Sequence, residues 1–267
     1  SINGKNRGDI SRKLEVSEEH ASLLFHSGVL TKRIMEVLGA QHIWAPEVCL
    51  CDGIVYEYAQ QNKLLKNIHD FEKDILASTA NISKRYMCSR KRNEFMESLA
   101  LSIFDTMKKL HGLGKRERLL LQIAARLNDC GKYISQTDVG ECSFRIIMAT
   151  EIIGLSHAER EIVAYVAKYD RDEFEYYEVL GEHTTLSREA YLVIAKLTAI
   201  LRVANGLDRS HKQKFRDFKT TLRENELTIT VDTDEDITLE KGLLTARTQF
   251  FEEVYSVRTV IRQKRRI

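Results

Sequence analysis

The segment LLLQIAARLNDCGKYIS, residues 119–135, has the pattern of an apolar helix that ends on a polar pair. Its apolar residues recur at helical spacing up to Asn128 and Asp129, and Gly131 and Lys132 follow directly. Adjacent residues on a helix lie about 100° apart, so two neighbouring polar side chains can reach one point where helices cross. The segment therefore predicts a buried helix that brings polar groups into the interior of a helical domain.

The chain around this segment keeps the same 3.6-residue period from about Asp70 to Asp208, which predicts an all-α domain. Four glycines near the ends of apolar stripes suit left-handed helix termini: Gly114, Gly131, Gly154 and Gly206. In NIHDF, residues 67–71, a literal His-Asp pair precedes a helix. We expect Asn67 or Asp70 to cap that helix rather than to bind a metal with His69.

The region before this block predicts a mixture of helix and strand. Ser17 and Gly39 have the residue types that begin and end a helix. The sequence then predicts strands at His42–Ala45 and near Val48–Cys51, a turn at Pro46 between them, and a helix from about Asp52.

The region after Asp208 changes to a period of two in FRDFKTTLRE and ELTITVDT, joined by a turn at Asn225. The helix TLEKGLLTARTQFFEEVY and the strand RTVIRQK complete a β-β-α-β unit. We therefore expect a mainly α protein with three domains, at residues 1–64, 65–208 and 209–267.

The composition limits the classes of function. A chain of 267 residues with 43% hydrophobic residues can bury a core. Its charges nearly cancel to +2, so attraction to polyanions must come from local clusters. No apolar run approaches the ~18 residues that span a bilayer, and no secretory pattern is visible. We expect a cytoplasmic protein without membrane contact.

Three stretches carry a resemblance to a known family: FDTMKKLHGLGKRERLLLQIAARLNDCGKYIS, EIIGLSHAEREIVAYVAKYDR and LRVANGLDRSHKQKFRD. They resemble the C-terminal half of the exopolyphosphatase/guanosine pentaphosphate phosphohydrolase (Ppx/GppA) family. The resemblance implies an HD-type helical domain, a short C-terminal α/β domain and, in residues 1–64, the end of the second actin-like domain. It also implies polyphosphate or guanosine polyphosphate as ligand, the family's actin-like domains as partners, and a homodimer. Under this resemblance the sequence starts inside an actin-like domain, and we therefore expect the chain to be a piece of a longer protein.

An intact HD-type site would hold a metal through a His, a His-Asp pair and a later Asp. In this chain the pair position reads Asn128-Asp129, the first His falls at about Phe95, and the late Asp falls at Asn205. One carboxylate is left where a divalent ion needs three or more protein ligands. The resemblance therefore predicts no metal, no other cofactor and no confident catalytic residue. The vestigial site comprises Asn128, Asp129, Asn205 and Asp208. As the alternative to an outright core, Asn128, Asp129 and Asn205 form a polar remnant in which they hydrogen-bond one another or a water between helices.

Two groups of basic residues are candidates for polyanion binding: Lys84, Arg85, Arg90, Lys91 and Arg92, and further along Arg209, Lys212 and Lys214. A run of charge is usually a solvated face, yet several clusters on one surface could follow a phosphate chain through charge-assisted hydrogen bonds. Nucleic acid would be attracted by the same physics, but no motif for its specific recognition is present.

These observations leave more than one function open. The first hypothesis is a regulatory, polyanion-binding and dimerisation portion of an exopolyphosphatase-type protein. The alternative is a divergent HD phosphohydrolase acting on nucleotides or phosphate esters, with Asp129, Asp170 and Asp208 around Mg²⁺ or Mn²⁺. A purely structural dimerisation domain is the third. No glycine-rich phosphate loop of the actin-like cleft is recognisable in the chain.

Overall fold

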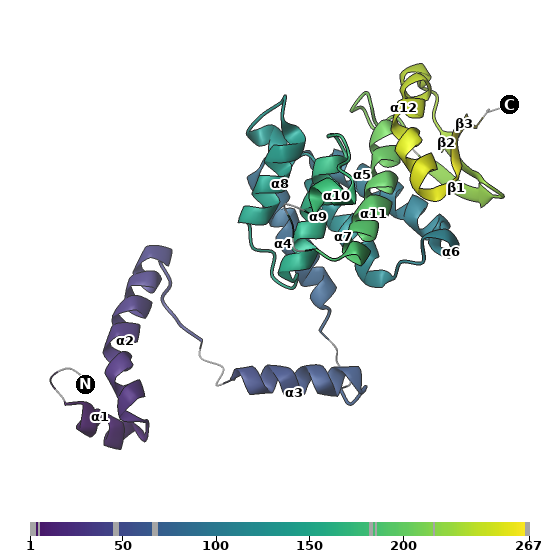
Figure 1. Cartoon of the computed structure of the whole chain (residues 1–267). Coiled ribbons are helices and arrows are strands. Elements are labelled where there is room, and N and C mark those ends of the chain that lie inside the picture. The colour runs from purple at the N-terminus through teal and green to yellow at the C-terminus, as the bar shows by residue number, and fades with distance from the viewer. Residues whose placement is uncertain are drawn as a thin grey trace. The chain divides into compact units, whose positions relative to one another are not determined.

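The computed structural model describes residues 4, 6–44, 48–65, 69–181, 184, 186–215 and 217–264. The chain divides into two compact units, Ser1–Ile68 and His69–Ile267. Figure 1 shows the elements of each unit in chain order. Both units are dominated by helices, which confirms the mainly α class. None of the described helices is long and apolar enough to cross a bilayer.

The described residues of the N-terminal unit form three helices, α1 (Arg7–Leu14), α2 (Glu18–Leu38) and α3 (Leu50–Gln61). The predicted ends of α2 are confirmed. The Ser17 hydroxyl accepts a hydrogen bond from the His20 N–H, and Gly39 is left-handed with φ of 65°. A glycine adopts that conformation without the steric cost that a Cβ brings.

The strand predicted near Val48–Cys51 is wrong. Cys49 is the residue that precedes α3, and the carboxylate of Asp52 accepts its N–H at 2.7 Å. A carboxylate placed three residues into a helix satisfies a backbone donor in this way, so the short apolar run starts a helix. His42, Ile43 and Trp44 are also outside any strand, whereas Ala45 and Pro46 lie outside the described residues. The actin-like origin of this unit stays a prediction.

The C-terminal unit begins with a block of helices. Their bounds are α4 (Phe71–Arg85), α5 (Arg90–Thr106), α6 (Lys108–His111), α7 (Lys115–Leu127), the 3₁₀ helix η1 (Cys130–Tyr133), α8 (Val139–Ala149), α9 (His157–Tyr169), α10 (Tyr177–Leu180) and α11 (Arg188–Gly206). Asp70 caps α4 by accepting the Lys73 N–H, as predicted. Whether this block has the HD-type arrangement stays a prediction.

Helix α7 lies in the middle of the block and contacts α4, α5, α9 and α11. Leu121, Ile123 and Leu127 are fully buried on it, and each such side chain contributes about 1.5–3 kcal/mol relative to exposure. Helix α7 is thus covered from several sides, and the ends of α5, α9 and α11 bring polar side chains to its C-terminus.

Of the four glycines predicted to end helices in the left-handed conformation, one has that conformation. Gly154 has a φ of 93°, but Gly114, Gly131 and Gly206 are not left-handed. Gly131 is required for a different reason, which is the close approach of α8. A Cβ there would lie 2.2 Å from the Val139 carbonyl oxygen and 2.6 Å from the Ser143 nitrogen. The turn after Asp129 can therefore pack directly against the backbone of α8.

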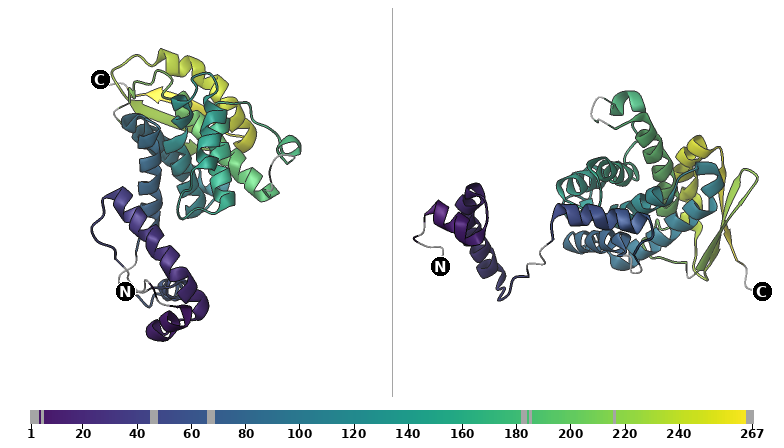
Figure 2. Two further views of the ribbon diagram at one scale, coloured as in Figure 1. Left: turned by 90° about the vertical axis from the view of Figure 1, so that its left-hand side faces the viewer. Right: turned by 90° about the horizontal axis from the view of Figure 1, so that it is seen from below.

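The chain ends in the predicted β-β-α-β order, with β1 (Asp217–Arg223), β2 (Glu226–Asp232), α12 (Thr238–Tyr255) and β3 (Arg258–Gln263). Strand β2 is central, antiparallel to β1 and parallel to β3. Helix α12 contacts both α11 and β3, and Figure 2 shows it between the helical block and the sheet. Buried side chains of the sheet share one core with the helices. The domain boundary near residue 208 stays a prediction.

Candidate functional site

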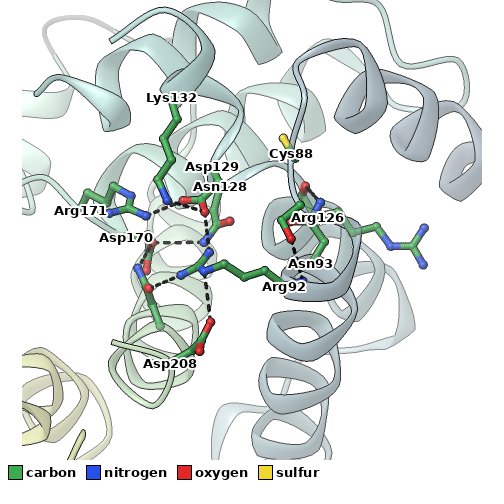
Figure 3. A network of polar contacts seen from close by, with 12 residues as sticks. Cys88, Arg92, Asn93, Arg126, Asn128, Asp129, Lys132, Asp170, Arg171 and Asp208 are labelled. Carbon is green, nitrogen blue, oxygen red and sulfur yellow. Dashed lines mark hydrogen bonds and ion pairs between the residues drawn. The ribbon is translucent and has the colours of Figure 1, made fainter. Parts of the chain in front are cut away.

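The predicted vestigial residues meet at the end of α7. Asn128 and Asp129 follow α7 directly, whereas Asn205 and Asp208 lie at the end of α11. Two further side chains contribute to the site. Asp170 was predicted here only under the divergent phosphohydrolase alternative, and Arg92 was predicted in a basic cluster. Arg92 extends from the first turn of α5, and Asp170 follows the last residue of α9. Figure 3 shows the side chains of Arg92, Asn128, Asp129, Asp170 and Asp208 close together between the helix ends.

The centre of the site is the guanidinium group of Arg92, which is 3% exposed. Its Nη1 donates to Asp129 Oδ2 at 2.7 Å, and its Nη2 donates to Asn205 Oδ1 at 2.8 Å. Its Nε lies 3.2 Å from Asp208 Oδ2. One side chain of α5 thereby connects the ends of α7 and α11 through a fixed cation.

This position differs from the prediction that Arg92 belongs to an exposed basic cluster. Arg92 falls on the same face of α5 as the buried residues Met96, Leu99 and Ile103, at spacings of four, three and four. That spacing is the sequence signal that separates Arg92 from its exposed neighbours Arg90 and Lys91.

Phe95, the position assigned to the missing His, lies one helical turn further along α5. Its ring contacts Phe215 and Phe218, with ring centroids 5.9 and 6.5 Å away. Phe95 therefore packs toward the C-terminal sheet, and Arg92 is the residue of α5 that reaches the polar site.

Asp129 carries three cationic partners. Besides Arg92, Lys132 donates to Oδ2 at 2.8 Å and Arg171 donates to Oδ1. Burial by itself raises the pKa of this carboxyl, but the charges of Arg92, Arg171 and Lys132 outweigh burial and hold the pKa below its ordinary value. Asp129 is therefore a carboxylate at neutral pH, with each oxygen occupied by a donor.

Asp170 also lies near cations, namely Arg171, Arg247 and Arg92, but its burial outweighs their effect on the pKa. Its side chain is fully buried, and Oδ2 accepts hydrogen bonds from the amides of Asn205 at 2.6 Å and Asn128 at 3.4 Å. Burial raises the pKa of Asp170 above its ordinary value. Among the described residues, Asn128, Asp129 and Asn205 are joined through Asp170 and Arg92 rather than by direct hydrogen bonds to one another. The alternative of a water between the helices stays a prediction.

The donor set does not fit a divalent metal. Within the described residues, no three His, Cys, Asp or Glu side chains converge as ligands. Asp129 and Asp208 each form an ion pair with Arg92, so the guanidinium group already supplies the positive charge at the point between them. A metal there would be repelled by Arg92 and would have to displace it. The absence of a metal stays a prediction, and this arrangement favours it.

The remaining basic candidates divide into paired and unpaired residues. Arg90 forms an ion pair with Glu94, and the largely buried Lys214 pairs with Glu240 and donates to the Asp236 carbonyl. Lys214 therefore has a structural role that its sequence context did not indicate. Five others are exposed and have no ion-pair partner among the described residues, namely Lys84, Arg85, Lys91, Arg209 and Lys212.

A cavity of about 590 Å³ brings the two basic segments together. Met87 and Ser89, between α4 and α5, line it together with His211, which follows α11. The five unpaired cations do not line the cavity themselves, but Arg85, Lys91 and Lys212 are the sequence neighbours of its lining residues Tyr86, Arg92 and His211. Arg92, Asp129 and Lys132 also line it, so the cavity opens onto the buried network.

Comparison with known proteins agrees with this arrangement of elements. Residues 76–249 match the family model described as Ppx/GppA phosphatase, domain III. The chain belongs to the Ppx/GppA phosphatase family. The resemblance carried by the three sequence stretches is thereby confirmed.

A curated relative is the guanosine-5'-triphosphate,3'-diphosphate pyrophosphatase of Aeromonas hydrophila subsp. hydrophila. It is 26% identical over 184 residues, which cover 68% of this chain and 35% of the relative. The chain thus spans about a third of the length of that Ppx/GppA-related protein.

The Arg92 network predicts a large loss of stability when the cation is removed. In Arg92→Met, Asp129 and Asp208 lose a buried counter-ion, which typically costs about 3–5 kcal/mol. Chemical denaturation of the variant should show this decrease in the free energy of unfolding. Arg90→Met, which removes an exposed cation two residues away, should change it by no more than about 0.5 kcal/mol. Equal effects of the two substitutions would contradict a structural role for Arg92.

The two neighbouring carboxyls predict opposite responses to pH. Folding lowers the pKa of Asp129. The stabilisation that this carboxylate adds to the free energy of unfolding is therefore complete above its unfolded pKa of about 3.9, and it is lost as the pH falls through the folded pKa. Folding raises the pKa of Asp170. The stabilisation that its protonated form adds to the free energy of unfolding is therefore complete below about pH 3.9, and it is lost as the pH rises through the folded pKa. At pH 8, Asp129→Asn should be less stable than the parent and Asp170→Asn at least as stable. Denaturation curves between pH 4 and 8 test this, and the same sign for both variants would refute it.

Proposed function

We propose that this chain is the non-hydrolytic, polyanion-binding portion of a Ppx/GppA-type phosphatase, with polyphosphate or a guanosine polyphosphate as its ligand. Membership of the family supports the ligand class. The observation that carries the proposal is that the two loops beside the exposed basic segments line one cavity, while Asp129 and Asp208 are already paired with Arg92.

The unpaired cations supply the chemistry that a phosphate chain requires. Arginine and lysine form charge-assisted hydrogen bonds to phosphate oxygens, about twice as strong as neutral ones. Lys84, Arg85 and Lys91 lie at the end of α4 and the start of α5, and Arg209 and Lys212 follow α11. Because no described carboxylate forms an ion pair with them, binding a polyanion breaks no ion pair within the protein.

The N-terminal unit supports a second part of the proposal, which is attachment to other protein surfaces. It exposes large apolar side chains, among them Trp44, Val37, Leu38 and Leu50, with Trp44 at 88% exposure. Exposed large apolar side chains in this number within one unit are consistent with an interaction surface. We assign this surface to the family's actin-like domains, which would carry out hydrolysis, and assign to the chain a role in homodimer formation and a place in the cytoplasm.

Polyphosphate binding tests the ligand assignment. The purified chain should bind long-chain polyphosphate with an affinity that falls steeply with salt, as expected when cations release counter-ions from a polyanion. The triple substitution of Lys84, Arg85 and Lys91 by Ala should weaken binding at least about tenfold and reduce the salt dependence.

A control with the same change of charge separates local binding from net charge. Lys13, Lys109 and Lys241 are exposed, distant from one another in sequence and without an ion pair among the described residues. Their substitution by Ala should reduce the affinity for polyphosphate much less. The proposed surface would be contradicted if both triple variants lost the same amount of polyphosphate affinity. It would also be contradicted if the parent chain showed no salt-sensitive binding.

Metal content tests the non-hydrolytic assignment. After equilibration with Mg²⁺ or Mn²⁺ and removal of free ion, elemental analysis should find far less than one metal per chain, because Arg92 occupies the position between the carboxylates. The chain should leave phosphate monoesters and nucleotides intact. Stoichiometric metal together with hydrolysis that Asp129→Asn abolishes would instead establish the divergent HD phosphohydrolase.

A further inference from the structure

Strand β1 forms one edge of the C-terminal sheet, and the bonds of its neighbour β2 determine where its main-chain groups point. Arg258 of β3 donates its N–H to the carbonyl of Asn225, which directly precedes β2. The main-chain groups of successive strand residues point to opposite sides, so the odd-numbered residues of β2 bond β3 and the even-numbered ones bond β1. The register pairs those even-numbered residues with the odd-numbered residues of β1.

The other residues of β1 are Phe218, Thr220 and Leu222, and their N–H and C=O groups point away from β2. In the described part of the chain, no backbone hydrogen bond uses these groups. The strand runs from Asp217 to Arg223 without a proline, and its register with β2 has no bulge. Prolines and bulges are among the devices that protect an edge strand from pairing with another chain. The edge of β1 is therefore a template for a further strand.

The surface beside β1 has room for a second molecule. The hydroxyl oxygen of Thr220 lies 2.7 Å from that of Ser102 and 2.6 Å from that of Thr106, both on α5. Ser102 and Thr106 also line a cavity of about 740 Å³, together with Ser98 one turn earlier on α5. The molecule is therefore hollowed next to Thr220, and small side chains form that part of its surface.

The sequence of β1, DFKTTLR, is complementary to itself in the antiparallel direction. When Thr220 lies opposite Thr220 of a second copy, Asp217 lies opposite Arg223 and Phe218 opposite Leu222, each pair occurring twice about the two-fold axis. The open main-chain groups of the two strands then face one another in hydrogen-bonded pairs. Asp217 and Arg223 are exposed and have no ion-pair partner among the described residues, so each is available to the other copy.

The charges of β1 also select this register. A shift by two residues in one direction places Lys219 opposite Lys219 of the second copy, and a shift in the other direction places it opposite Arg223. Like charges directly opposite each other destabilise a pair of strands, whereas opposite charges and apolar pairs stabilise it. A shift by one residue would bring in main-chain groups that already bond β2. Pairing centred on Thr220 is thus favoured over its neighbours.

We propose that two copies of this chain associate through β1, in an antiparallel pair centred on Thr220 that joins their two sheets into one. The inference rests on the homodimer formation within the proposed function and names the surface that makes it. The self-complementary charges of Asp217 and Arg223 identify the partner as a second copy of the chain. The contact involves neither the apolar side chains of the N-terminal unit nor the cations assigned to polyphosphate.

Sedimentation equilibrium of the full chain over a range of concentrations tests the proposal. The parent chain should form a dimer. Asp217→Arg places Arg opposite Arg223 of the second copy, and Arg223→Asp places Asp opposite Asp217. Each variant alone should therefore raise the dissociation constant of the dimer about tenfold or more. An equimolar mixture of the two variants should dimerise like the parent, because each contact between the two different chains again joins opposite charges.

Matched controls make the same changes of charge at exposed residues outside β1, with Glu151→Arg and Lys241→Asp. Both should dimerise like the parent. Single variants in β1 that dimerise like the parent would overturn pairing through β1 and leave the homodimer standing. A mixture that fails to dimerise would overturn the proposed register and with it the proposal. A parent chain that remains monomeric would overturn both the homodimer and this inference, whereas polyphosphate binding is measured independently of either.

Discussion

The buried guanidinium group of Arg92 is the interaction on which the arrangement of the helical block depends. It comes from α5, donates hydrogen bonds to Asp129 after α7 and to Asn205 at the end of α11, and forms an ion pair with Asp208. Removing two carboxylates from water is costly unless a counter-ion and hydrogen bonds compensate them. A planar fork with several donors can serve three acceptors at once, which an ammonium group cannot do with the same fixed geometry. The ends of three helices are therefore held in one relative position.

The same interaction decides what chemistry the site can perform. A metal site in this fold would need carboxylates and imidazoles with free lone pairs directed at one point. Here the carboxylates are directed at an organic cation that is part of the chain, and Asp170 is buried against the amides of Asn128 and Asn205. The charges are balanced internally. What remains open to a ligand is the adjoining cavity, which Lys132 and His211 line.

Much of the local structure could be predicted because it depends on residues close in sequence. The caps at Ser17 and Asp70 and the β-β-α-β order follow from residue type and periodicity. The strand expected near Val48–Cys51 failed for a related reason. A short apolar run has no period of its own, and the Asp52 side chain, three residues after Cys49, favours a helix there.

The sequence by itself determined the helical class, the family and the amide at position 128 where the resemblance would place an imidazole, since these depend on patterns along the chain. Only the tertiary structure decided which residues surround Asn128 and Asp129. Arg92 stands in a run of basic residues, and charge alone does not distinguish a solvated side chain from a buried counter-ion. The difference arises because the ends of α7 and α11 present Asp129 and Asp208 to the inner face of α5. Arg92 precedes Asp129 by 37 positions and Asp208 by 116 positions, so these contacts form only when the helices pack together.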